Sequence, residues 1–198
     1  IGEEYRDWFT FAIAENTEND NDFFTVGPDA ATGKILVTGN DGIALASGLN
    51  YYLEEYCNVQ VAEQTSQVKM PAAIVPMEEA VRCETPYKIR YAFNYCTLNY
   101  TFSYADAEVF QREYDWMALS GVNCVIDLAG QEAVWIKFLQ NFGYTFDEAK
   151  DWIAGPSYYA WQFMDNMEVV GGPVSDEWVI GRLEMARANQ RFKNSLGM

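Results

Sequence analysis

Polar side chains of mixed chemistry follow a predicted strand near the middle of the chain. The run that begins at Tyr87 reads YKIRYAF, in which aromatic and branched side chains alternate with polar ones, as they do in strands. The polar and aromatic residues that come after this run are Asn94, Cys96, Thr97, Asn99 and Tyr100. In parallel α/β folds ligands bind at the ends of strands. Polar groups in this place are candidates for a ligand site, and the alternative is that Asn94 caps a turn and Cys96 belongs to the core.

A second set of candidates follows the apolar run 123–130, which is typical of a strand buried on both faces. Gln131 and Glu132 come directly after it. From the residues alone Glu132 is a candidate general acid, and the alternative is a glutamate of a first helical turn, favoured by the helix dipole. Asp127 lies inside the run, where a buried carboxylate needs a partner that the sequence does not identify.

The composition limits the chemistry and the partners. The chain contains no His, which excludes Ser-His and Cys-His dyads, so proton transfer would rely on carboxylates. A net charge of −16 argues against nucleic acid and against an anionic membrane surface. No apolar run approaches the roughly 18 residues of a membrane-spanning helix. The four cysteines form no C-x-x-C pair, so we expect buried free thiols rather than a zinc site or a disulfide framework.

The elements that position these residues divide between two predicted domains. Residues 1–85 predict a small α+β domain of order β-β-β-α-β-β, in which one helix after Gly42 packs on an antiparallel sheet. The expected strands cover residues 8–15, 23–26, 34–38, 59–62 and 67–70. Pro71, Pro76 and Pro86 mark a connector, so the second domain is predicted over residues 86–198.

The second domain begins with a predicted right-handed βαβ unit. Its helix starts at a capping box from Ser103 to Asp106 and ends at Gly121. Further helices are predicted from Gln131 to Gly143, after the capping box at Thr145, with Pro156 at a first helical position, and from Ser175 to about Asn194.

The length of this second domain predicts an incomplete barrel. A complete (β/α)8 barrel requires about 250 residues, whereas about 112 residues run from Tyr87 to the last residue. Two strands alone would leave a long exposed edge. We therefore expect an α/β chain, with a small N-terminal domain followed by the first two βα units of an incomplete (β/α)8 TIM-like barrel, as a fragment of a larger protein.

Several long motifs, in order, resemble a known family. NYCTLNYTF, EYDWMALSGVN, GQEAVW, GPSYYAWQFM and the closing NSLGM are similar to the α-N-acetylglucosaminidases of glycoside hydrolase family 89. The similarity also includes GLNYYLEEYC, followed after a gap by SQVKMP. The first 85 residues resemble the small α/β domain that precedes the barrel in that family.

The resemblance implies a retaining exo-hydrolase that releases terminal α-linked N-acetylglucosamine without a metal or another cofactor. In the family both catalytic groups are glutamates on later barrel strands, so it implies that neither lies before Met198 and that the isolated chain is inactive. The expected partners are a glycan ending in α-linked N-acetylglucosamine and the remainder of the barrel, with no nucleic acid and no membrane insertion. The family is exported or lysosomal, which implies an extracytoplasmic (periplasmic, secreted or lysosomal) location.

The resemblance also assigns roles to individual residues. Asn94, Cys96, Tyr100 and Trp161 match sugar-contacting positions, with the indole as a flat wall for the pyranose. It favours a supporting role for Gln131 and Glu132, either in binding the sugar or in holding the residues that bind it. The alternatives are that Asn94 caps a turn while Cys96 and Trp161 belong to the core, and that the chain is a non-catalytic carbohydrate-binding or structural module.

Overall fold

The computed structural model describes residues 2–16, 18–64, 68–127 and 129–198. The chain forms two compact units, each assembled from separate segments. Unit 1 comprises Ile1–Arg90, Glu113–Cys124 and Ser195–Met198, and unit 2 comprises Tyr91–Arg112 and Val125–Asn194. The domain boundary expected after residue 85 stays a prediction.

Unit 1 is built on a four-stranded sheet. A short 3-10 helix, η1 (Glu3–Trp8), leads into β1 (Phe9–Ile13), which is followed by β2 (Asp22–Pro28), β3 (Ile35–Gly39) and β4 (Val81–Thr85). The order across the sheet is β1-β3-β2-β4. β1 is parallel to β3, whereas β2 is antiparallel to both β3 and β4. The sheet is therefore mixed and not purely antiparallel as expected, because β3 has an antiparallel neighbour, β2, on one side and a parallel neighbour, β1, on the other.

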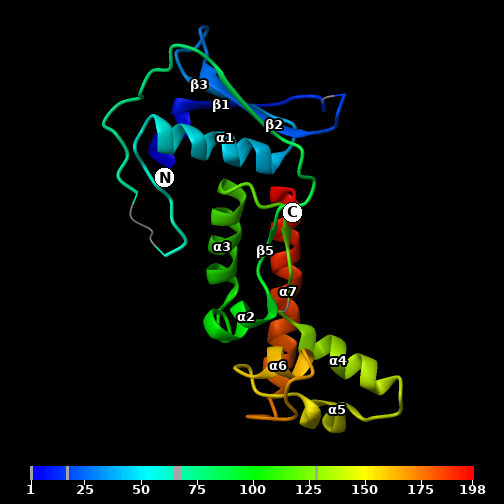
Figure 1. Cartoon of the computed structure of the whole chain (residues 1–198). Coiled ribbons are helices and arrows are strands. Elements are labelled where there is room, and N and C mark those ends of the chain that lie inside the picture. The colour runs from blue at the N-terminus through cyan, green and yellow to red at the C-terminus, as the bar shows by residue number, and fades with distance from the viewer. Residues whose placement is uncertain (1, 17, 65–67, 128) are drawn as a thin grey trace. The chain divides into compact units, whose positions relative to one another are not determined.

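One helix, α1 (Gly42–Glu55), packs on this sheet, as Figure 1 shows. Its N-cap is Asp41, whose carboxylate accepts the backbone N–H of Ala44 at 2.6 Å. A Cβ at Gly48 would lie 2.7 Å from Val37 Cγ1, so a glycine is what allows the helix to approach the sheet this closely.

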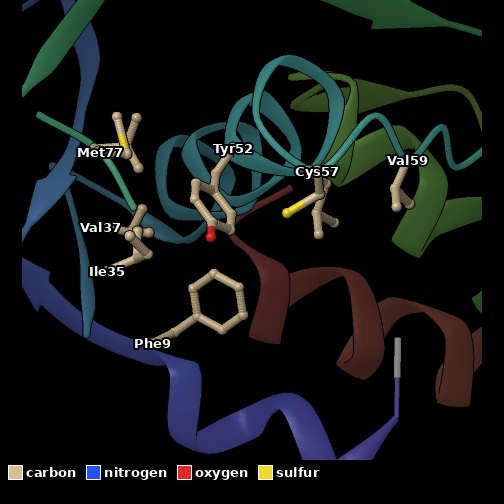
Figure 2. Close-up of a cluster of buried hydrophobic side chains, with 9 residues drawn as sticks. Phe9, Ile35, Val37, Tyr52, Cys57, Val59 and Met77 are labelled. Carbon is tan, nitrogen blue, oxygen red and sulfur yellow. The ribbon is translucent and has the colours of Figure 1, made fainter. Parts of the chain in front are cut away.

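The core of unit 1 lies between α1 and the sheet (Figure 2). The Tyr52 ring meets the Phe9 ring edge-on at a centroid distance of 5.6 Å. The Tyr52 hydroxyl donates to the carbonyl of Val75 at 2.7 Å and accepts from its N–H at 3.0 Å. Burial raises the pKa of Tyr52 above its ordinary value. The segment after α1 is thus fixed to the core by a side chain.

Two expected strands in this segment are wrong. Residues 59–62 and 68–70 form no strand, and residue 67, where the second was expected to begin, lies outside the described residues. Val59, Val61 and Met70 pack against the core from an irregular segment. The last strand of the sheet is instead β4, inside the predicted connector. Its burial alternates along VRCET, a period of two that the sequence contains.

The two strands predicted for the second domain are much shorter than expected. β5 (Tyr91–Ala92) and β6 (Cys124–Val125) form a two-stranded sheet. The carbonyl of Arg90 accepts the N–H of Cys124, and the carbonyl of Ala92 accepts that of Ile126. Because the partners advance together, the pairing is parallel.

Local turns end both strands of this pair. Phe93 has φ +72°, a left-handed conformation that interrupts extended backbone. Beyond β6, the carboxylate of Asp127 accepts the N–H of Ala129 at 3.1 Å, an Asx-type turn.

The other regular elements of unit 2 are helices. They are α2 (Tyr95–Thr101), the first part of α3 (Ala107–Leu119), α4 (Gln131–Gln140), α5 (Phe146–Trp152), α6 (Tyr159–Phe163) and most of α7 (Asp176–Leu196). No helix of the described residues is both long enough and apolar enough to cross a membrane.

Some of the predicted helix caps are present in the structure and others are not. The capping box of Thr145 and Glu148 is confirmed, and Ser175 Oγ accepts the N–H of Trp178 at 3.2 Å at the start of α7. The box from Ser103 to Asp106 is wrong. Asp106 accepts the N–H of Val109, while Ser103 Oγ donates back to the carbonyl of Asn99. Pro156 is not at a first helical position either, because α6 begins three residues later.

Candidate functional site

Three of the predicted site residues lie on α2. Asn94 is its N-cap, and Oδ1 accepts the backbone N–H of Thr97 at 3.0 Å and its hydroxyl at 3.2 Å. Both bonds use Oδ1, so capping does not require the Nδ2 donor of this exposed amide. Cys96 is half-buried in the first turn of the helix. The polar residues expected at a strand end therefore lie on the short helix that follows β5.

Tyr100 and Trp161 form an aromatic pair. Tyr100 on α2 is 78% exposed, and its ring meets that of Trp161 on α6 edge-on, with centroids 5.2 Å apart. Trp161 is half-buried. These two residues are 61 positions apart in the sequence, and the structure brings their rings into contact. Their role as sugar contacts stays a prediction. An exposed phenol beside an indole is a surface that the apolar face of a pyranose can cover.

Glu132 lies in a different environment, at the start of α4. Its side chain is 0% exposed, and Oε1 accepts the indole N–H of Trp178 at 3.0 Å. Within the part of the chain that the structure describes, Oε2 has no hydrogen-bond partner. Burial raises the pKa of Glu132 above its ordinary value, and the bond from Trp178 and the charge of Arg182 only partly oppose this shift. A buried, easily protonated glutamate supports the packing of α4 on α7 and is closed to solvent.

The neighbours of Glu132 show how this region is held together. Gln131 Nε2 donates to the carbonyl of Asp127 at 3.3 Å. The partner that Asp127 requires is Lys193 of α7, with Nζ 2.7 Å from Oδ2. Sequence reasoning did not find this pair, because the two residues are 66 positions apart and no local pattern connects them.

The predicted site residues therefore fall into two groups. Asn94, Cys96 and Tyr100 share α2, and Tyr100 joins Trp161. Gln131 and Glu132 contact Asp127 and α7 instead. Among the described residues, no hydrogen bond, ion pair or ring contact links Glu132 directly to Tyr100 or Trp161. Nor do the described residues include a group of three or more Cys, Asp or Glu that could hold a metal ion.

Asn99, to which neither the residues nor the resemblance assigned a role in the site, connects α2 with α6. Asn99, 7% exposed, accepts the backbone N–H of Ala160 at 2.8 Å through Oδ1 and donates through Nδ2 to the carbonyl of Pro156. The available signal was an Asn between apolar helical neighbours, which is common enough in helices to carry little weight.

A separate cavity of about 160 Å³ lies in unit 1, lined mainly by apolar side chains of β2, α1 and β4. The ion pair of Arg90 and Asp22, at 2.7 Å, also contributes to its wall. None of the predicted site residues lines it.

Comparison with known proteins identifies the family. Residues 90–198 match the family model described as Alpha-N-acetylglucosaminidase (NAGLU) tim-barrel domain, and residues 1–77 match the corresponding N-terminal domain. The fold and the family models thus define a chain of mixed α/β architecture that is related to glycoside hydrolases. The chain belongs to the α-N-acetylglucosaminidase family.

Individual relatives agree with this. A family 89 glycoside hydrolase from Clostridium perfringens, solved with two Glu-to-Gln substitutions and its substrate GlcNAc-alpha-1,4-galactose, is 43% identical with a TM-score of 0.95. Its complex with PUGNAc gives 43% identity and a TM-score of 0.93. The human alpha-N-acetylglucosaminidase is 33% identical over 177 residues, which is 89% of this chain.

The coverage of these relatives is partial. The chain matches over 100% of its own length but spans 22% of the solved Clostridium chain and 24% of the human protein.

Proposed function

We propose that this chain forms the N-terminal domain and the first part of the catalytic barrel of a retaining exo-glycosidase that releases terminal α-linked N-acetylglucosamine. The observation that carries the proposal is the match along the whole chain, at 43% identity, to an enzyme solved with a disaccharide of that kind. Under this proposal residues 1–85 precede the barrel, and β5 and β6 are its first two strands.

The role proposed for this chain is to build one side of the sugar site. The Tyr100–Trp161 pair supplies an apolar wall for the pyranose ring, and the Asn94 amide supplies a donor to its hydroxyl or acetamido groups. Cys96, one turn before Tyr100, lines the site beside Asn94. Gln131 and Glu132 act behind it by fixing the start of α4.

The reaction itself is proposed to use groups outside these 198 residues. Retaining hydrolysis needs a nucleophilic carboxylate and a carboxylic acid about 5–5.5 Å apart. Glu132 is closed to solvent and bonded to Trp178, so it fits neither role. The Clostridium relative bound to its substrate carries glutamine at two glutamate positions, which supports a mechanism based on two glutamates. An extracytoplasmic location is proposed from the family alone.

The test is hydrolysis by the intact protein that contains this chain. We expect release of N-acetylglucosamine from an aryl α-N-acetylglucosaminide, with the α-anomer as the first sugar product by NMR, and no hydrolysis of the β-linked isomer. Failure to cleave the α-linked substrate overturns the proposed activity. Initial release of the β-anomer overturns the retaining mechanism alone.

The second candidate is a non-catalytic carbohydrate-binding or structural module. The observation that favours it is that Asn94 already has a structural task as the N-cap of α2. Binding of N-acetylglucosamine by an intact protein that cleaves no glycoside would support the binding module. Absence of both binding and cleavage would support the structural one.

A further inference from the structure

Asn99 joins two short helices through a side chain that is almost entirely buried. Oδ1 accepts the N–H of Ala160 at 2.8 Å, and Nδ2 donates to the carbonyl of Pro156. The backbone carbonyl of Asn99 in turn accepts the hydroxyl of buried Ser103 at 2.6 Å. The amide thus satisfies a backbone acceptor before α6 and a buried backbone donor within it.

The position of these bonds in the sequence gives them their importance. Asn99 immediately precedes Tyr100, and Ala160 immediately precedes Trp161, so the bond from Ala160 to Asn99 fixes the backbone next to both rings of the pair. α2 has seven residues and α6 has five. Helices this short do not hold their own geometry in water, so the ring pair depends on such tertiary bonds.

A second buried amide secures α6 from its other side. Gln162 Oε1 accepts the N–H of Ala154 at 2.7 Å, and its Nε2 donates to the carbonyl of Trp152 at 2.6 Å. Trp161 therefore lies between Ala160, whose backbone is bonded to Asn99, and Gln162, whose side chain is bonded to Ala154 and Trp152. Asn99 is the one that connects Trp161 with the helix carrying Tyr100.

The sequence around Asn99 also fits an N-glycosylation site, but the burial of Asn99 in the folded chain opposes that role. N-Y-T at residues 99–101 has the pattern of an N-glycosylation acceptor. An acceptor asparagine must be reachable on the surface, whereas Asn99 is 7% exposed and uses both ends of its amide internally.

We propose that Asn99 is the positioning residue of the sugar-binding aromatic pair. It touches no substrate. It holds the rings of Tyr100 and Trp161 in the edge-on arrangement that the face of a hexosamine covers. This inference rests on the proposed function, because it assumes that the pair contacts the sugar.

The test compares steady-state kinetics of the intact protein and its Asn99→Asp variant on an aryl α-N-acetylglucosaminide. Aspartate keeps the acceptor for Ala160 but loses the donor to Pro156. We expect KM to rise about tenfold, while kcat stays within about threefold, because the lost bond affects binding rather than the reacting groups.

A double-mutant cycle with Trp161→Ala separates positioning from general destabilisation. If Asn99 acts through Trp161, its substitution raises KM much less once Trp161 is absent. The matched control is Asn123→Asp in unit 1. It makes the same change in an amide that likewise accepts a backbone N–H, of Arg90, and donates to a backbone carbonyl, of Lys88. We expect this control to leave KM unchanged.

The outcomes distinguish the two proposals. An inactive wild-type protein overturns the proposed function. An active wild type whose Asn99→Asp variant keeps its KM, or raises it equally with and without Trp161, overturns the positioning role. Should Asn99→Asp fail to fold, Asn99→Ser, which carries no charge, is measured by the same criteria.

Discussion

Asn94 has a structural and a proposed ligand-binding task, and two substitutions separate them. Aspartate caps helices as well as asparagine does, so Asn94→Asp should change the free energy of unfolding by less than about 0.5 kcal/mol, whereas Asn94→Ala should lower it by about 1 kcal/mol. Both remove the Nδ2 donor, so both should weaken binding of an N-acetylglucosamine-like inhibitor to the intact protein. Urea unfolding and inhibitor titration measure the two effects. Full affinity in Asn94→Asp would show that Asn94 is a cap only.

The buried carboxyl of Glu132 predicts a pH dependence of stability. Because burial raises its pKa, the folded state holds this proton more tightly than the unfolded chain does. The corresponding stabilisation is complete below the ordinary pKa of about 4.5 and is lost as pH rises toward the raised value. Glu132→Gln keeps an acceptor for Trp178 without the charge. Its stability relative to wild type should therefore increase as pH rises above about 4.5.

The measurement is urea unfolding between pH 4 and pH 8, with Glu148→Gln as the control. Hydrogen bonds from Thr145 lower the pKa of Glu148. The stabilisation that its carboxylate contributes is therefore lost as pH falls, which is the opposite pH dependence. Parallel pH profiles for wild type and Glu132→Gln would contradict the assignment of a raised pKa to Glu132.

At the scale of elements, two glycines in helices predict opposite effects of the same substitution. A Cβ at Gly48 of α1 would lie 2.7 Å from Val37 Cγ1, and Val37 is fully buried, so Gly48→Ala should cost about 1–3 kcal/mol. A Cβ at Gly181 of α7 meets nothing within 4 Å. Gly181→Ala should therefore stabilise by about 0.5–1 kcal/mol through helix propensity. Thermal unfolding of the two variants checks both signs. A neutral Gly48→Ala would mean that α1 and the sheet pack less closely than described.

At the scale of the whole molecule, we predict that the 198-residue chain alone does not hydrolyse an aryl α-N-acetylglucosaminide. The carboxyl that sequence reasoning singles out, Glu132, is buried and bonded to Trp178. The measurement is turnover by the purified chain, with the intact protein as the positive control. Hydrolysis by the purified chain would place a working carboxylate pair within it.

Under the proposed function, the net charge of −16 on these 198 residues predicts which glycan is the better substrate. A negative surface repels a highly sulfated polyanion, so we predict faster cleavage of a neutral glycan ending in α-linked N-acetylglucosamine. Rates on sulfated and neutral substrates are compared at two salt concentrations, since salt screens the repulsion. Faster cleavage of the sulfated substrate at low salt would contradict this prediction.

Local patterns and long-range contacts differ in how far the sequence predicts them here. The box at Thr145, the cap at Ser175 and the strands β1, β2 and β3 follow from neighbouring residues, which the sequence displays directly. The expected strands at 59–62 and 67–70 show the limit, because an apolar run can bury its side chains from an irregular segment as well as from a strand. The site behaves the same way: the family resemblance assigned Tyr100 and Trp161 to the sugar site, but it gave no role to Asn99.

The sequence by itself determined the family and the starts of α1, α4, α5 and α7, because motifs and helix caps depend on residues close together in the chain. Tertiary structure decided that Glu132 is buried under Trp178, that Asp127 pairs with Lys193, and that Asn99 ties Tyr100 to Trp161. These contacts join residues 46 to 66 positions apart. These contacts stabilise the protein only after packing has brought the partners together and excluded water. No local sequence pattern therefore predicts them.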